Sequence, residues 1–204
     1  MEVKREYYLN QLISHKHNGL IKIISGIRRC GKSYLLSELF RKHLLAEGVK
    51  EDHIIHIALD DYEKKQYRNP DNCYQYVKSS IKDDEMYYLL LDEVQMMDSF
   101  EDVLNGFLHI KNLDVYVTGS NSKFLSSDVV TEFRGRGDEI RVYPFSFAEF
   151  YSAVGGDWSD AWREYYTYGG MPLILSKKTD EEKAKYLQDL FKETYIRDIE
   201  ERNK

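Results

Sequence analysis

The sequence predicts an α/β fold in which helices sandwich a parallel β-sheet. A glycine-rich segment at residues 26–33 lies between an apolar, β-branched run and a segment with helical spacing. A second apolar run ends in two consecutive acids at residues 92 and 93, and strand-like and helix-like segments alternate from residue 20 to residue 143. Such alternation is typical of parallel sheets, because parallel strands need crossover connections, which are usually helical.

The glycine-rich segment reads GIRRCGKS and matches the phosphate-binding P-loop pattern G-x-x-x-x-G-K-[ST] at every fixed position. Its glycines let the backbone turn so that successive N–H groups face one anion. Lys32 brings a positive charge to the β- and γ-phosphates, and the Ser33 hydroxyl is a ligand for Mg²⁺. A glycine turn that merely joins a strand to a helix would not need this pair. We expect the following residues to contact a nucleotide: Gly26, Ile27, Arg28, Arg29, Cys30, Gly31, Lys32, Ser33 and Tyr34.

The segments on either side of the P-loop fit this interpretation. Residues 20–25 are short, apolar and β-branched, which predicts a buried strand. Residues 33–47 carry apolar side chains at helical spacing, with Gly48 as the stop. The positive end of such a helix favours phosphate.

Residues 86–93, MYYLLLDE, predict a strand that ends in two acids, which is the Walker B pattern. Ligands of open parallel sheets bind at the carboxyl ends of the strands. We expect Asp92 to hold Mg²⁺ and Glu93 to orient or deprotonate the attacking water. Many strands end at a solvated acid, so this pattern gains its weight from the P-loop in the same chain.

Residues 113–121, LDVYVTGSN, predict another short strand that ends in small polar residues. If this strand lies between the P-loop strand and the Walker B strand, Ser120 or Asn121 is within reach of the γ-phosphate or the attacking water. The residues alone support a second interpretation equally well, in which one of the two side chains caps the following helix.

The segments GIRRCGKS, LLLDEVQ and VTGSNS, followed by FRGR at residues 133–136 and VYPFSFAEF at residues 142–150, resemble the prokaryotic AAA-type ATPases. The resemblance covers most of the chain. It implies an AAA-like P-loop NTPase core with a small helical lid, which binds ATP and Mg²⁺. It also favours Ser120 over Asn121 as the residue that senses the γ-phosphate.

The same resemblance makes Arg134 and Arg136 candidates for an arginine finger, acting in cis or from a neighbouring subunit. The residues alone offer an equally good alternative, in which these arginines pair with nearby acids in an exposed loop. YGGMPL at residues 168–173 resembles the G-x-P motif of STAND-type ATPases, which implies that Pro172 packs near the adenine. Pro172 also suits the first turn of a helix.

We expect residues 1–144 to form the ATPase core and residues 145–204 to form the lid and the start of a linker. In the resembled family, a segment like residues 195–199 lies near the end of the ATPase region, before a C-terminal domain that resembles PD-(D/E)xK nucleases. The resemblance therefore implies that this chain is the ATPase portion of a longer protein.

Composition and charge limit the partners. The net charge is −6 and no basic block stands out, so charge does not support a nonspecific nucleic-acid surface, although it does not exclude a local one. No apolar run approaches the roughly 20 residues of a membrane span, and the first residues lack a signal-peptide core. We therefore expect a cytoplasmic protein without a membrane partner. Two cysteines are too few for a disulfide framework or a zinc site.

The sequence thus predicts an ATPase that moves its lid or a partner domain with Mg²⁺-dependent hydrolysis. The expected partners are ATP and ADP and a C-terminal domain of the same protein. A second copy of the chain is a partner only if the arginine finger acts in trans, and the residues leave that open. One alternative is a nucleotide-switched binding module with slow turnover. A P-loop kinase is a weaker alternative, because the arginines after residue 144 are few and well separated.

Overall fold

The structure of the protein is a computed structural model that describes residues 3–119 and 135–196. Its contacts divide the chain into two compact units. The sheet unit comprises Glu6–Gly26 and Lys32–Arg141, and the helical unit comprises Met1–Arg5, Ile27–Gly31 and Val142–Lys204. The predicted boundary at residues 144 and 145, and the role of the second part as a lid, stay predictions.

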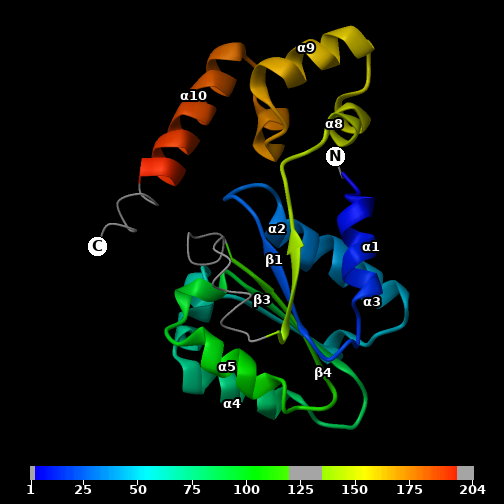
Figure 1. Ribbon diagram of the computed structural model, residues 1–204, viewed down its shortest axis with the longest axis vertical. Coiled ribbons are helices and arrows are strands. Elements are labelled where there is room, and N and C mark those ends of the chain that lie inside the picture. The colour runs from blue at the N-terminus through cyan, green and yellow to red at the C-terminus, as the bar shows by residue number, and fades with distance from the viewer. Residues whose placement is uncertain (1–2, 120–134, 197–204) are drawn as a thin grey trace. The chain divides into compact units, whose positions relative to one another are not determined.

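Within its described residues, the sheet unit holds a five-stranded parallel sheet in the order β2-β3-β4-β1-β5 (Figure 1). The predicted α/β class with a parallel sheet is therefore confirmed. Because β4 lies between β1 and β3, its carboxyl end separates the ends of the P-loop strand and the Walker B strand. The strands are β1 (Ile21–Ser25), β2 (Ile54–Ala58), β3 (Tyr87–Asp92), β4 (Leu113–Thr118) and β5 (Gly137–Arg141).

Helices cover both faces of this sheet (Figure 1). On one face, the Phe40 ring lies 4.5 Å from the Tyr116 ring of β4, measured between centroids. On the other, Leu89 and Val117 share a buried cluster with Val77 of α4. The helical segments of the unit are α1 (Glu6–Ser14), α2 (Lys32–Tyr34), the π-helical η1 (Leu35–Phe40), α3 (Arg41–Ala46), η2 (Glu51–His53), η3 (Tyr62–Arg68), α4 (Pro70–Ser80), η4 (Val94–Met96) and α5 (Phe100–Phe107).

The starts of α4 and α5 differ in how they are capped. Asn69 accepts a hydrogen bond from the N–H of Asn72, and Pro70 opens α4, as its sequence predicts. A capping box between Asp98 and Glu101, which the spacing of an acid and a glutamate suggests, is wrong. The residue before α5 is Ser99, whose φ of 50° is left-handed and whose side chain makes no capping hydrogen bond.

The helical unit is built on α8, α9 and α10, with two shorter helical segments. The hydroxyl of Ser146 and the carboxylate of Glu149 form a capping box at the start of α8, and Thr179 and Glu182 form another at α10. Phe150 is fully buried in the unit's apolar cluster. The segments are α8 (Phe147–Val154), α9 (Trp158–Tyr168), η5 (Pro172–Ser176), α10 (Asp180–Phe191) and the π-helical η6 (Lys192–Ile196).

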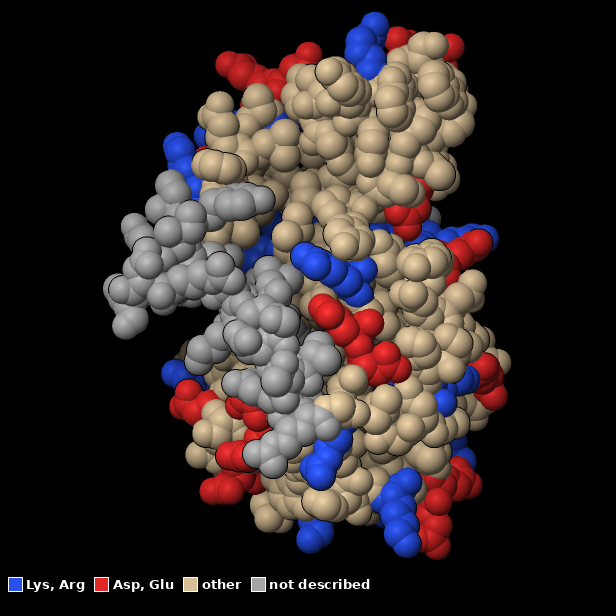
Figure 2. Space-filling model, in the orientation of Figure 1, with Lys and Arg blue, Asp and Glu red and all other residues tan. Residues whose placement is uncertain are grey.

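The surface carries charges of both signs. Over the described residues visible in Figure 2, Lys and Arg side chains are interspersed with Asp and Glu side chains. Among the described helices, none combines the length and the apolar character that crossing a membrane requires.

Candidate functional site

The P-loop connects the end of β1 to the start of α2. Its two fixed glycines, Gly26 and Gly31, have φ angles of 146° and 100°, which side chains rarely adopt. Lys32 is buried, and its Nζ donates a hydrogen bond to the Gly26 carbonyl at 3.0 Å. The ammonium group that the motif offers to a phosphate therefore joins the two ends of the loop.

Asp92, the predicted Walker B acid, lies close to Ser33 of the P-loop. Asp92 is the last residue of β3 and is only 4% exposed. Its carboxylate accepts hydrogen bonds from the hydroxyls of Ser33 and Thr118. The two residues predicted to hold Mg²⁺, Ser33 and Asp92, are thus in direct contact.

Burial raises the pKa of the Asp92 carboxyl above its usual value. The nearby carboxylates of Glu93 and Asp60 act in the same direction, whereas the hydrogen bonds from Thr118 and Ser33 oppose it. A buried carboxylate beside a hydroxyl is a set of hard oxygen donors, and a divalent cation would relieve the cost of its charge. The residues present therefore fit Mg²⁺.

Glu93 occupies a strained position directly after Asp92. Its φ of 54° and ψ of 49° are left-handed, which costs a non-glycine residue roughly 1–2 kcal/mol. Its N–H donates to the Thr118 hydroxyl at 3.0 Å, and its carboxylate accepts a hydrogen bond from the Gln95 amide. Such strain is typical of functional positions, where the surrounding contacts hold it in place.

Thr118 is a further candidate residue for this site, and the sequence did not predict it. It ends β4, and its hydroxyl contacts both acids of the Walker B segment. The available signal was its place as the last residue of the strand that precedes Ser120 and Asn121. The condition set for those two residues, that β4 lies between β1 and β3, is fulfilled, but Ser120 and Asn121 themselves lie outside the described residues.

The two candidate arginines have different outcomes. Arg134 lies outside the described residues. Arg136 is exposed and precedes β5, and its carbonyl accepts a hydrogen bond from the Ile21 N–H at the amino end of β1. Because the strands are parallel, Arg136 lies at the sheet edge opposite to that of Asp92. A strand of five residues spans about 16 Å, which exceeds the reach of one side chain.

The middle of the P-loop, Ile27–Gly31, groups with the helical unit. The Arg29 guanidinium pairs with the Glu193 carboxylate at 2.9 Å. A Cβ atom placed on Gly31 would lie 3.8 Å from Cγ of Pro172. Pro172, the residue predicted to contact adenine, is therefore near the loop within this unit. Pro172 also opens η5, as its alternative interpretation requires. Ile27 and Tyr34 are exposed, Arg28 is half-buried, and Cys30 is fully buried.

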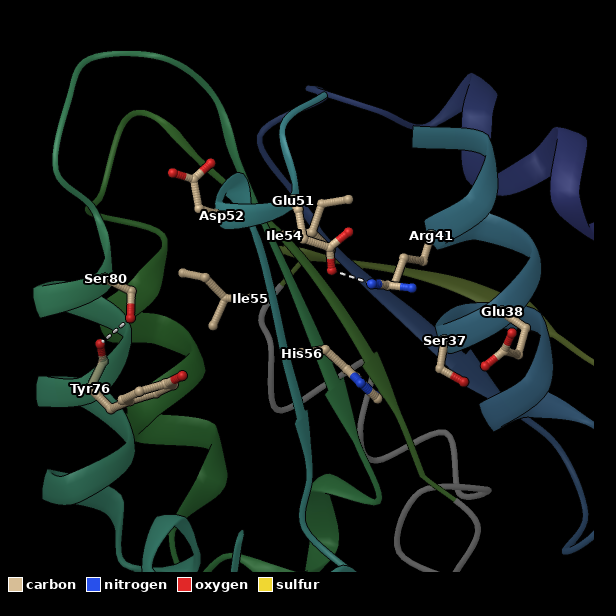
Figure 3. A pocket seen from close by; sticks show the side chains of 10 residues that line it. All are labelled: Ser37, Glu38, Arg41, Glu51, Asp52, Ile54, Ile55, His56, Tyr76 and Ser80. Carbon is tan, nitrogen blue, oxygen red and sulfur yellow. Dashed lines mark hydrogen bonds and ion pairs between the residues drawn. The ribbon is translucent and has the colours of Figure 1, made fainter. Parts of the chain in front are cut away.

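A separate groove runs along the open edge of β2 (Figure 3). Its volume is about 440 Å³, and Arg41 pairs with Glu51 at its rim. Its lining includes none of the predicted nucleotide residues: Ser37, Glu38, Arg41, Glu51, Asp52, Ile54, Ile55, His56, Tyr76 and Ser80. The chemistry predicted from the sequence therefore lies elsewhere in the fold.

Comparison with known proteins shows a family to which this chain is similar. Residues 18–151 match the family model described as "AAA domain". An uncharacterized protein of Haemophilus influenzae is 33% identical over 98% of this chain and 51% of its own length. An uncharacterized protein of Methanocaldococcus jannaschii is 28% identical over 90% of this chain and 42% of its own length. The chain therefore spans about half the length of these curated relatives.

Among solved structures, a DNA polymerase III gamma subunit-related protein of Thermotoga maritima superposes with a TM-score of 0.54. The match covers 87% of this chain and 57% of the other, at 14% identity. At that identity the likeness concerns the fold alone.

Proposed function

Because the chain belongs to the AAA-domain family, we propose that it binds ATP with Mg²⁺ and hydrolyses the bond to the γ-phosphate. Family membership supports a nucleotide-binding, ATPase-like domain. The observation that carries the finer proposal is the direct contact of Ser33 with Asp92, which joins the P-loop to the Walker B strand. Both residues are at the carboxyl edge of the parallel sheet, where such folds bind their ligands.

Each side chain has a defined task in this proposal. Lys32 exchanges its contact with the Gly26 carbonyl for the β- and γ-phosphates. Ser33 and Asp92 would hold Mg²⁺, which would neutralise charge on the phosphate oxygens. Glu93 orients the attacking water and accepts its proton. Thr118 keeps the two acids in their relative orientation.

The remaining predicted residues stay proposals of the same kind. Ser120 or Asn121 would contact the γ-phosphate from the end of β4, and Pro172 would pack beside the adenine. Because Arg136 lies at the opposite edge of the sheet, we favour its action on the nucleotide of a second copy. Movement of the helical unit or of a partner domain would be the output of turnover.

The test is Mg²⁺-dependent phosphate release from ATP and from GTP by the full chain. The proposal expects ATP turnover that disappears in Glu93→Gln, with ATP binding retained. It also expects loss of ATP binding in Lys32→Ala. Lys78→Ala, in the exposed face of α4, is the matched control and should behave as the wild type does.

Two other outcomes have clear meanings. Tight ATP binding without turnover, lost in Lys32→Ala, would replace the ATPase proposal by the nucleotide switch. Binding and turnover that survive both Lys32→Ala and Glu93→Gln would refute the assignment of the site.

A further inference from the structure

Arg5 is a buried arginine that the proposed chemistry does not use. It is 3% exposed, and its φ of 47° is left-handed. Within the helical unit, its Nη1 donates to the Cys30 carbonyl at 3.0 Å and its Nη2 donates to the Tyr143 carbonyl at 2.6 Å. Its Nε lies 2.9 Å from the Glu149 carboxylate. A buried charge with a strained backbone persists only where its surroundings hold it firmly.

The contact with Cys30 fixes one peptide of the P-loop. In a trans peptide the C=O of one residue and the N–H of the next point in opposite directions. Because Arg5 holds the Cys30 carbonyl, the Gly31 N–H points away from Arg5. In a P-loop, successive N–H groups of this stretch are the donors that bind phosphate.

The other contacts of Arg5 fix the guanidinium itself. The Arg5 Cζ lies 5.1 Å from the centre of the Phe145 ring. The Phe145 N–H in turn donates a hydrogen bond to the Gly170 carbonyl at 2.8 Å, which holds Phe145 in place. The Tyr165 hydroxyl donates to the Phe145 carbonyl at 2.9 Å. The segment that leads into α8 therefore forms a rigid support for Arg5.

We propose that Arg5 is a positioning residue that turns the Cys30–Gly31 peptide so that the Gly31 N–H faces the nucleotide phosphates. The inference rests on the proposed nucleotide site and adds a residue that contacts no nucleotide atom. The planar fork of arginine suits this task, because its donors sit on three separate nitrogen atoms that reach two carbonyls and a carboxylate in fixed directions, whereas the donors of an ammonium group all leave from one nitrogen atom.

The binding test compares ADP with AMP, because AMP lacks the β-phosphate that the P-loop binds. Each is measured by displacement of a fluorescent ADP analogue from the full chain in the presence of Mg²⁺. Arg5→Gln should weaken ADP binding by about 10- to 100-fold, the range for loss of a charged hydrogen bond. Binding of AMP should change by less than about 3-fold. Arg5→Lys should show a smaller loss for ADP.

Glu149→Gln is the matched control. It removes the ion pair with Arg5, while glutamine keeps the capping box of α8 and Arg5 keeps its bond to Cys30. Its ADP affinity should stay near that of the wild type. Equal ADP affinity in the wild type and both Arg5 variants would overturn the inference, as would a loss in Glu149→Gln equal to that in Arg5→Gln.

A spectroscopic measurement separates this inference from the proposed function. In the nucleotide-free protein, the amide resonance of Gly31 should move in both Arg5 variants and stay in place in Glu149→Gln. An unmoved resonance in the Arg5 variants would refute the inference even if ADP binds tightly. If the wild type itself fails to bind ADP, the proposed function fails, whatever the resonance does.

Discussion

The Thr118 hydroxyl, at the end of β4, donates a hydrogen bond to the Asp92 carboxylate at the end of the adjacent strand β3. The same oxygen accepts the N–H of Glu93 at 3.0 Å. One side chain therefore contacts both residues of this segment, Asp92 at its carboxylate and Glu93 at its backbone N–H. Its position follows from the strand order, since β4 separates β3 from the P-loop strand.

Replacing Thr118 by valine should impair turnover while preserving the shape of the side chain. The Glu93 N–H and the Asp92 carboxylate each lose a partner, and an unpaired buried polar group costs about 1–3 kcal/mol. If that cost falls on the transition state, phosphate release at saturating ATP should drop by about 5- to 150-fold. Thr118→Ser keeps the hydroxyl and should retain most of the turnover. Wild-type turnover in the valine variant would show that Thr118 has no part in orienting the acids.

The raised pKa of Asp92 predicts how its replacement by asparagine affects stability. Because the folded-state pKa lies above the ordinary value of 3.8, ionising Asp92 costs more in the folded than in the unfolded protein. The metal-free protein therefore loses stability as the pH rises from about 3.8 through the folded-state pKa. Asp92→Asn should raise the Tm at pH 7 in a chelator, by about 2–4 °C per kcal/mol gained.

The control for that measurement repeats the comparison of Tm values near pH 4 and in the presence of Mg²⁺ with ATP. Near pH 4 the gain of Asp92→Asn should shrink towards zero, because less of the wild-type carboxylate is then ionised. Adding Mg²⁺ with ATP should stabilise the wild type more than the variant. A Tm difference that does not depend on pH would mean that the charge of Asp92 is not its cause.

The residues of the site that follow from the sequence are those whose spacing is local. Lys32 and Ser33 share one loop, and Asp92 ends one strand, so a short pattern identifies each of them. The sequence did not predict roles for Thr118 and Arg5, because those roles depend on partners far away in the chain. The Arg5 guanidinium binds carbonyls 25 and 138 residues away. No periodicity or motif carries such a pairing.

The last strand shows how apolar patterning misplaces an edge strand. The apolar character of residues 140–143 predicts a strand there, whereas β5 spans Gly137–Arg141. Pairing with β1 begins at Gly137 opposite Ile21 and sets the register. Of the five residues in β5, Ile140 alone is buried, so most of the strand carries no hydrophobic signal. Backbone pairing, rather than side-chain burial, defines this element.

A buried ion pair holds the amino ends of two neighbouring strands together. Lys22 of β1 is fully buried, and its ammonium group donates to the Asp114 carboxylate and to the Leu20 carbonyl, the latter at 2.8 Å. Burial lowers the pKa of Lys22, and the contact with Asp114 opposes that shift. Lys22→Met should lower the free energy of unfolding by about 3–5 kcal/mol, because it leaves Asp114 buried without its cation.

Urea unfolding of a double-mutant cycle measures that coupling. Adding Asp114→Asn to Lys22→Met should recover part of the loss, because the uncompensated charge is then removed. Strictly additive losses in the two single variants and the double variant would show that the pair is not coupled.

Gly170 is required by a close approach of two backbone segments in the helical unit. Its carbonyl accepts the Phe145 N–H at 2.8 Å, and a Cβ atom on Gly170 would lie only 2.0 Å from the Phe145 carbonyl oxygen. Gly170→Ala must therefore push apart the segment that supports Arg5 and the start of η5, at a cost of about 1–3 kcal/mol or more. We expect faster amide exchange across α8 and η5, with the sheet unit unchanged. In Gly156→Ala the added Cβ meets no atom within 4 Å, so the only cost is the strain of a φ of 77°. Amide exchange in the helical unit should therefore accelerate less in this variant than in Gly170→Ala. Equal exchange rates in the two variants would refute the steric argument.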